Sequence, residues 1–236
     1  MKLGDRTKFY EKYGGGSSFH GSVGKCFGLC LLTFVLVFCT LGLGTPWAVC
    51  MWHRYKMNNL VIDGYEIVFE GKGHQLFWRY HGVTLIAILS FGWFGVWAHI
   101  KIEDWLVERT HIKHYESEAY PGEFCRKSVF GGGVFEHNMR VFLQVLFVIL
   151  TLGFAMPWVI CMDQRWHLDN MIIDGRQVIF EGKGRKFFWR YLFWTFLTII
   201  TLGIWSCWMA VKMLKWDAKY THFDNSLYTK IDSPLA

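Results

Sequence analysis

The chain has 236 residues, of which 53% are hydrophobic and only 19% are charged, whereas about a quarter of a typical soluble domain is charged. Its formal net charge is +6, but the basic residues flank long apolar runs, which favours anionic lipid headgroups as partners and argues against nucleic acid. Six of the 7 cysteines lie inside those runs and only Cys125 does not, so the sequence predicts no disulfide framework.

Four apolar runs contain no Asp, Glu, Lys or Arg: residues 26–52, 83–100, 141–162 and 192–211. Each is close to or above the length of about 18 residues that suggests a membrane span. The first run follows a mixed polar segment and is too long for the apolar part of a signal peptide, so we expect it to be retained. The sequence predicts an all-α integral membrane protein with four transmembrane helices.

The first half of the chain recurs at a constant offset of 111 residues. A segment with Phe-Glu-Gly-Lys-Gly and Phe-Trp-Arg-Tyr occurs at 69–80 and again at 180–191. Chance does not produce such agreement, so we predict two tandem two-span repeats. The predicted organisation is a polar Gly-rich segment (1–25), a first repeat (26–111), a polar linker (112–137), a second repeat (138–222) and a tail (223–236).

Short stretches with strand character lie between the two spans of each repeat. They flank Asp63-Gly64 in the first repeat and Asp174-Gly175 in the second. Asp-Gly at such a position is typical of a tight hairpin turn. We expect one short β-hairpin in each repeat. Because an isolated hairpin is marginal in water, the two either pair with each other or pack on aromatic residues at the membrane surface.

Each predicted span contains a glycine that is followed five residues later by a tryptophan. These tryptophans are Trp47, Trp97, Trp158 and Trp208. We expect them to anchor the spans at the level of the lipid headgroups.

Only the first and third spans also have a proline four positions after the glycine, in the pairs Gly42 with Pro46 and Gly153 with Pro157. A proline inside a helix removes a hydrogen bond and clashes with the carbonyl four residues earlier. We expect these two spans to kink at those pairs, and the second and fourth spans not to kink.

Basic residues next to the spans are candidates for contacts with lipid headgroups. They are Lys72, Arg79, Lys183 and Arg190. The alternative interpretation is an ordinary strand end with a surface ion pair between Glu70 and Lys72, worth less than ~1 kcal/mol.

Motifs for catalysis or for metal binding are missing from the sequence. It has no His-Glu-x-x-His, Cys-x-x-Cys or Gly-x-Ser-x-Gly. We therefore predict no catalytic residue, no metal and no cofactor. A metal or redox role for Cys26 and Cys30, which share a helix face, or a metal site at His111 and His114, remains a minor alternative.

The run at 39–51 resembles the YjgN-like bacterial membrane proteins of unknown function. So do Ile62-Asp63-Gly64, Phe69-Glu70-Gly71, the run at 201–205 and Lys219-Tyr220-Thr221-His222. The resemblance covers both repeats and implies a bacterial cytoplasmic-membrane protein built from two-span repeats. It brings no reaction, cofactor or catalytic residue. The run at 90–94 departs from the Thr-Leu-Gly-Ile-Trp pattern.

An even number of spans places both termini on the same side, and the Lys and Arg of the terminal segments and linker favour the cytoplasm. The preferred function is a non-enzymatic membrane scaffold or interaction protein with an unknown protein partner. The alternative is a homo-oligomeric channel or passive pore. An ion-coupled transporter or an enzyme acting on lipid is less favoured, because the spans contain almost no ionisable residues.

Overall fold

The computed structural model describes residues 16–90, 94–113, 128–201, 203 and 205–224, and each half of the chain folds in the same order of elements. The first half contains β1 (Ser18–Phe19), α2 (Val23–Cys39), α3 (Thr45–Asn58), β2 (Leu60–Ile62), β3 (Tyr65–Phe69), α4 (Gly73–Leu89), α5 (Gly95–Glu108) and β4 (Thr110–Ile112). The second half contains β5 (Val129–Phe130), α6 (Val134–Leu150), α7 (Met156–Asp169), β6 (Met171–Ile173), β7 (Arg176–Phe180), α8 (Gly184–Ile200), α9 (Ser206–Lys219) and β8 (Thr221–Phe223). Each element begins 111 residues after its counterpart.

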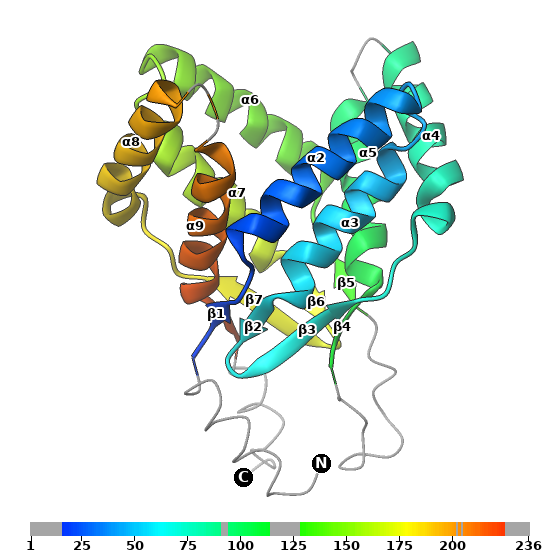
Figure 1. Cartoon of the computed structure of the whole chain (residues 1–236), viewed down its shortest axis with the longest axis horizontal. Coiled ribbons are helices and arrows are strands. Elements are labelled where there is room, and N and C mark those ends of the chain that lie inside the picture. Colours follow the sequence, from blue (N-terminus) through cyan, green and yellow to red (C-terminus); the bar gives the residue numbers. More distant parts are fainter. Residues whose placement is uncertain (1–15, 91–93, 114–127, 202, 204, 225–236) are drawn as a thin grey trace, which may run out of the picture.

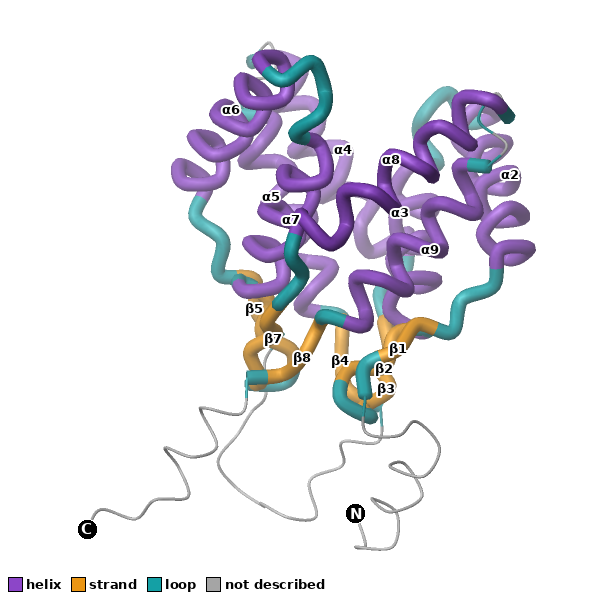
Figure 2. Tube along the Cα trace, turned by 90° about the vertical axis from the view of Figure 1, so that its left-hand side faces the viewer, coloured by secondary structure: helices purple, strands orange, loops and turns teal. Residues whose placement is uncertain are grey.

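The prediction of an all-α protein with four transmembrane helices is wrong. Each predicted span is instead part of a helical hairpin, in which a helix of 17 residues reverses into a helix of 14 residues. Within the described ranges, no helix has the length and apolar character needed to cross a bilayer. Two four-stranded antiparallel sheets complete the structure, and both lie at the end of the molecule from which the helices rise (Figures 1 and 2).

The reversal between α2 and α3 has a local backbone cause. Leu41 and Gly42 both have left-handed backbones, with φ of 50° and 90°. The Gly42 N–H donates to the Val37 carbonyl at 2.8 Å, which is the long bond of the motif that commonly ends helices. The Thr40 hydroxyl then accepts from the Gly44 N–H at 2.7 Å. These bonds satisfy the helix end while the chain turns back.

The same reversal occurs in the third and fourth predicted spans, and the fourth has no proline at this position. Gly153 and Gly203 repeat the bond and the positive φ of Gly42, while Gly92 lies outside the described residues. Pro46 and Pro157 lie in the first turn of α3 and α7, where a missing N–H costs nothing. The expected kink in a continuous helix is therefore replaced by a full reversal, and a left-handed glycine is common to the reversals at Gly42, Gly153 and Gly203.

Both predicted β-hairpins are present, and each forms the centre of a sheet. The strand orders are β1-β2-β3-β4 and β5-β6-β7-β8, all antiparallel. Asp63 and Gly64 have φ of 48° and 84°, the two left-handed residues that a tight two-residue hairpin needs. The hairpins do not pair with each other: each gains its outer strands from its own half of the chain. Strand β5 and the start of α6 fall in the segment predicted as a linker.

The turn of each β-hairpin binds the last strand of the other half. Asp63 accepts from the backbone N–H of Phe223 at 2.8 Å, and its other oxygen lies 2.7 Å from Nδ1 of His222. Asp174 lies 2.9 Å from Nδ1 of His111 in the same way. Strand β2 therefore lies beside β8, and β4 beside β6. The recurrent Thr-His of the sequence ties the two halves together.

The eight described helices form a closed ring. Each helix packs on the next one in the chain, and α9 packs on α2. The buried core lies where the short helices α3, α5, α7 and α9 meet the sheets, around residues such as Met57, Phe180 and Trp216. The reversals lie at the opposite end and are apolar and exposed: Leu41 is 94% exposed and Leu152 is 89% exposed.

Substituting alanine for Gly42 tests the reversal against a matched site. An added Cβ meets no atom within 4 Å at either Gly42 or Gly82, but only Gly42 has a positive φ. Gly42→Ala should therefore lower the free energy of unfolding by about 1 kcal/mol. Gly82→Ala, in the middle of α4, should raise it by about 0.5–1 kcal/mol. Denaturant unfolding followed by circular dichroism measures both, and equal effects would exclude backbone conformation as the cause.

Candidate binding cavity

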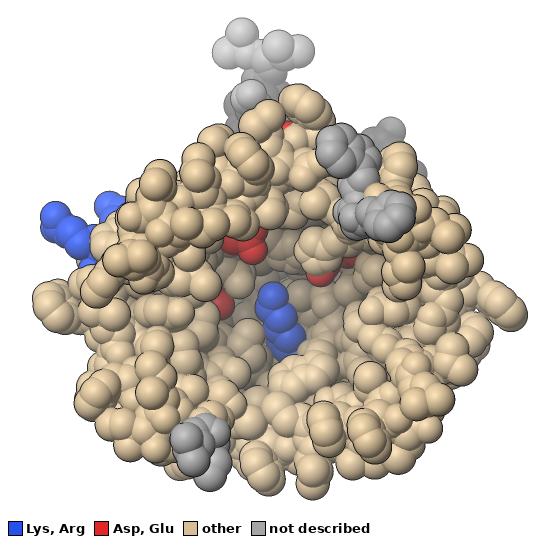
Figure 3. All heavy atoms as spheres, turned by 90° about the horizontal axis from the view of Figure 1, so that it is seen from above, with Lys and Arg blue, Asp and Glu red and all other residues tan. Residues whose placement is uncertain are grey.

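A hollow opens between the helices at the end of the molecule where the reversals lie (Figure 3). Its floor shows a basic side chain with acidic side chains around it, whereas the surrounding rim is almost free of charge. The cavity has a volume of about 560 Å³, and all of its lining residues come from α3, α5, α7 and α9. The closed ring of helices thus creates an interior that is more polar than its surroundings.

The same two positions of each short helix line this cavity. The ninth residues are His53, Glu103, Gln164 and Leu214, and the twelfth residues are Lys56, Leu106, His167 and Asp217. Residues three apart lie on one face of a helix. Four related helices therefore bring four different pairs of side chains to one centre.

Several polar groups in the cavity have no partner. The Lys56 ammonium forms no hydrogen bond or ion pair with any described residue. Oδ1 of Asp217 is buried and accepts no hydrogen bond in the described structure. His167 Nε2 lies 3.7 Å from Oε2 of Glu103, which is beyond hydrogen-bond length. A buried polar group without a partner costs about 1–3 kcal/mol, so these groups have unused capacity for a ligand.

Burial shifts the acidity of the groups around Lys56. It lowers the pKa of His53 and of His167 to about 3, helped by the positive charge of Lys56. Both imidazoles are neutral at pH 7, so the approach of His167 to Glu103 is not an ion pair. Burial raises the pKa of Asp217 to about 6, against the opposing effect of Lys56, and it raises the pKa of Glu103 as well.

One histidine of the cavity contacts a hydroxyl group. Oγ1 of Thr110 lies 3.3 Å from His53 Nε2. Thr110 is fully buried, and its hydroxyl donates to the Leu106 carbonyl at 2.9 Å. It is therefore held in the helix end and does not face the cavity as a nucleophile.

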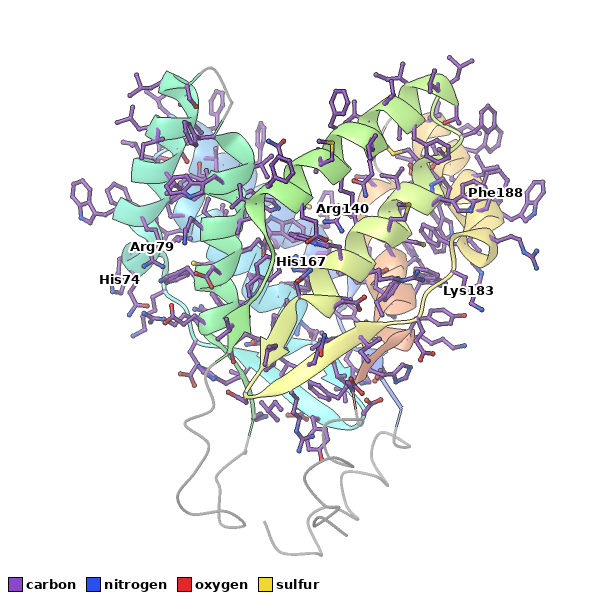
Figure 4. The ribbon with its side chains drawn as sticks, turned by 180° about the vertical axis from the view of Figure 1, so that it is seen from behind. His74, Arg79, Arg140, His167, Lys183 and Phe188 are labelled. Atoms are coloured by element: carbon purple, nitrogen blue, oxygen red, sulfur yellow. The ribbon has the colours of Figure 1, made fainter. Side chains whose placement is uncertain are left out.

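The residues predicted to contact headgroups lie on the outside of the ring. Lys72 and Arg79 are exposed on and beside α4, and Lys183 and Arg190 on and beside α8. Figure 4 shows Arg79 and Lys183 on opposite flanks of the molecule, far from the central His167. Next to the two arginines, Trp78 is 83% exposed and Trp189 is 76% exposed. Their contact with lipid stays a prediction.

The four predicted anchor tryptophans lie near the start of the short helices and pack in part against the long ones. Trp47 lies 5.6 Å from Phe77, and Trp158 lies 5.1 Å from Phe188, between ring centroids. Trp208 stacks on Trp205, and Trp97 is half-buried. Each keeps part of its surface available.

Sequence reasoning missed the cavity residues, because it assigned the polar ends of the short helices to tails that follow a span. Their signal was present: a polar side chain recurs at the ninth or twelfth position of all four short helices. The convergence of these positions requires the ring, which periodicity alone does not show.

Part of the chain is similar to a known bacterial protein. Part of the chain is 35% identical, over 72 residues, to the inner membrane protein YjgN of Salmonella typhimurium. The match covers 30% of this chain and 18% of YjgN, so it spans less than a fifth of that relative's length. No family model and no solved structure matches the chain. The resemblance to YjgN-like proteins is thus supported over part of the chain.

The raised pKa of Asp217 makes a prediction about stability and pH. Between about pH 4 and pH 6 the folded protein keeps this proton while the unfolded chain has lost it, so rising pH destabilises the fold through Asp217. Asp217→Asn removes this loss. The variant should gain stability relative to the wild type from pH 4 to 6, by on the order of 2 kcal/mol, and the difference should be constant above pH 6.

Urea unfolding across this pH range measures the difference in the free energy of unfolding between the variant and the wild type. The buried histidines are present in both proteins, so their contributions to the pH dependence cancel in this difference. Glu181→Gln, at an exposed carboxylate outside the cavity, is the control, and the difference for Asp217→Asn should depend on pH more strongly than the difference for this control. A flat difference for Asp217→Asn would show that this carboxyl is not buried as described.

Proposed function

We propose that the protein is a membrane-associated, non-enzymatic interaction protein that holds the polar headgroup of an amphiphile in its central cavity. The observation that carries this proposal is the unpartnered Lys56 in a cavity that opens between apolar hairpin ends. Although Glu103 and Asp217 line the same cavity, neither contacts the Lys56 ammonium directly. A cation without a direct partner favours an anionic ligand, and the apolar rim favours a ligand with a hydrocarbon part.

The outer surface supports a place at a membrane. The ends of the helical hairpins expose large apolar side chains, including Phe38, Leu89, Leu150 and Ile199. Such a continuous apolar surface indicates contact with lipid or with another protein. The exposed Trp78 and Trp189, each followed by an arginine, suit the headgroup level below these ends.

In this arrangement the helical hairpins enter one leaflet and return, since both ends of every helical hairpin lead to the sheets (Figure 1). Similarity to an inner membrane protein of Salmonella supports the bacterial cytoplasmic membrane as the site. The excess of Lys and Arg in the terminal and linking segments favours the cytoplasm for the sheet end.

The chemistry of the cavity selects the class of headgroup. Lys56 provides a positive charge for a phosphate or carboxylate, and the carboxyl group of Asp217, which also lines the cavity, provides an acceptor for an ammonium or hydroxyl group. The volume of about 560 Å³ lies in the range of ~300–1,000 Å³ that is usual for small-molecule sites. A phospholipid whose headgroup carries an amine or hydroxyls meets both requirements.

A homo-oligomeric pore is a weaker proposal for this chain. The polar cavity is formed by the helices of a single chain, and the sheets lie beyond its floor. An oligomer is not needed to create it, and a path through the sheet end is not among the described cavities.

Lipid retention by Lys56→Met tests the proposal. The wild type, purified in mild detergent and analysed by native mass spectrometry, should retain a phospholipid. Lys56→Met removes the ammonium group that contacts the headgroup, so the affinity for the phospholipid should fall by about tenfold to a hundredfold.

Lys101→Met removes an equal charge from an exposed position of α5 and should retain the lipid as the wild type does. Circular dichroism confirms that both variants are folded. Equal retention by Lys56→Met and the wild type would refute the proposed headgroup site.

A further inference from the structure

Three cysteines meet where the ring of helices closes. Cys26 and Cys30 lie one turn apart on α2, and Cys207 is the second residue of α9. Their sulfur atoms all lie within 4.8 Å of one another, and those of Cys30 and Cys207 are 3.5 Å apart. Cys26 is fully buried and the other two are partly buried. The cluster therefore joins the first helix of the chain to the last.

The spacing of the three sulfur atoms fits an ion held between them. With metal–sulfur bonds of about 2.3 Å, a three-coordinate ion places its sulfur ligands about 4 Å apart. No disulfide links the three side chains. Within the described chain, no His, Asp or Glu joins the cluster as a fourth ligand. Zinc in structural sites takes four ligands, whereas soft thiolate ligands also select monovalent copper.

We propose that Cys26, Cys30 and Cys207 form a three-sulfur site for monovalent copper that ties α2 to α9. The inference is independent of the headgroup site, because none of the three residues lines the central cavity. No electron transfer is involved: each thiol that binds the ion loses a proton to solvent, and the oxidation state of copper is unchanged.

The equivalent junction in the ring shows that the fold does not need these thiols for packing. Helices α6 and α5 meet there as α2 and α9 do here. The residues at the positions of Cys26, Cys30 and Cys207 are His137, Val141 and Val96. At this second junction the His137 ring of α6 lies beside the His99 ring of α5, with centroids 6.0 Å apart. Of these two equivalent junctions, only the one between α2 and α9 has cysteines at these positions.

The packing of the two helices holds the three thiols together. Cys26 and Cys30 come from α2 and Cys207 from α9, and these two helices pack on each other. The sulfur atoms are therefore close together before any ion binds. A soft cation that binds there displaces the thiol protons.

Competition for monovalent copper tests the proposal on the full chain. Reduced protein in mild detergent is titrated, without oxygen, against the complex of monovalent copper with a coloured chelator. The wild type should withdraw a single tightly held ion. Cys26→Ser, Cys30→Ser and Cys207→Ser should each weaken binding at least tenfold, and X-ray absorption should show sulfur ligands only.

Two controls separate the site from other thiols. Cys39→Ser, at an exposed position, and Cys161→Ser, at a buried position, should bind copper as the wild type does. The proposal is overturned if the Cys26→Ser, Cys30→Ser, Cys207→Ser triple variant withdraws as much copper as the wild type.

A second variant keeps the test valid if the serine variants do not fold. Introducing His137→Cys, Val141→Cys and Val96→Cys into the wild type places three thiols at the equivalent junction. This protein should bind a second copper ion, with a higher unfolding temperature in the presence of copper. Unchanged stoichiometry would contradict the geometry on which the proposal rests.

Discussion

The left-handed backbone at the ends of α2, α6 and α8 determines the architecture of this protein. At Leu41 and Gly42 the chain leaves α2 and turns back into α3, and Gly153 and Gly203 have the same backbone. Each apolar run is long enough to cross a membrane. Because of these reversals, it instead forms a helical hairpin that extends away from the sheets and turns back toward them. The apolar residues therefore gather at the hairpin ends, and the polar end of each short helix returns to the sheets.

Two consequences follow for the interior of the ring. The ninth and twelfth positions of four short helices meet in one cavity, where their side chains differ from helix to helix and produce one unpaired cation among weakened acids and neutral histidines. The two halves are locked by reciprocal bonds from Asp63 and Asp174 to strands of the other half. A repeated scaffold thus carries chemistry that differs between its copies.

Local signals predicted part of this structure from the sequence. The Asp-Gly turns define both β-hairpins, because few residue pairs tolerate two left-handed positions in succession. The prediction of transmembrane helices was wrong because one long helix and a helical hairpin can have the same composition and the same length. The glycine that recurs in all four apolar runs was the available signal. The left-handed backbone of Leu41 and Leu152, with φ of 50°, is not visible in the composition. The cavity depends on contacts between helices far apart in the chain, which periodicity does not contain.

The most direct measurement is the side of the membrane on which the strand ends lie. Residue 70 follows the first predicted span and residue 113 follows the second, so a spanning arrangement places them on opposite faces. In the structure the Glu70 N–H donates to the Arg109 carbonyl, and the Lys113 N–H donates to the Glu66 carbonyl. A membrane-impermeant thiol reagent applied to oriented vesicles should label Glu70→Cys and Lys113→Cys from the same face, above the labelling of the parent chain. Labelling from opposite faces would contradict the reversal of the helices.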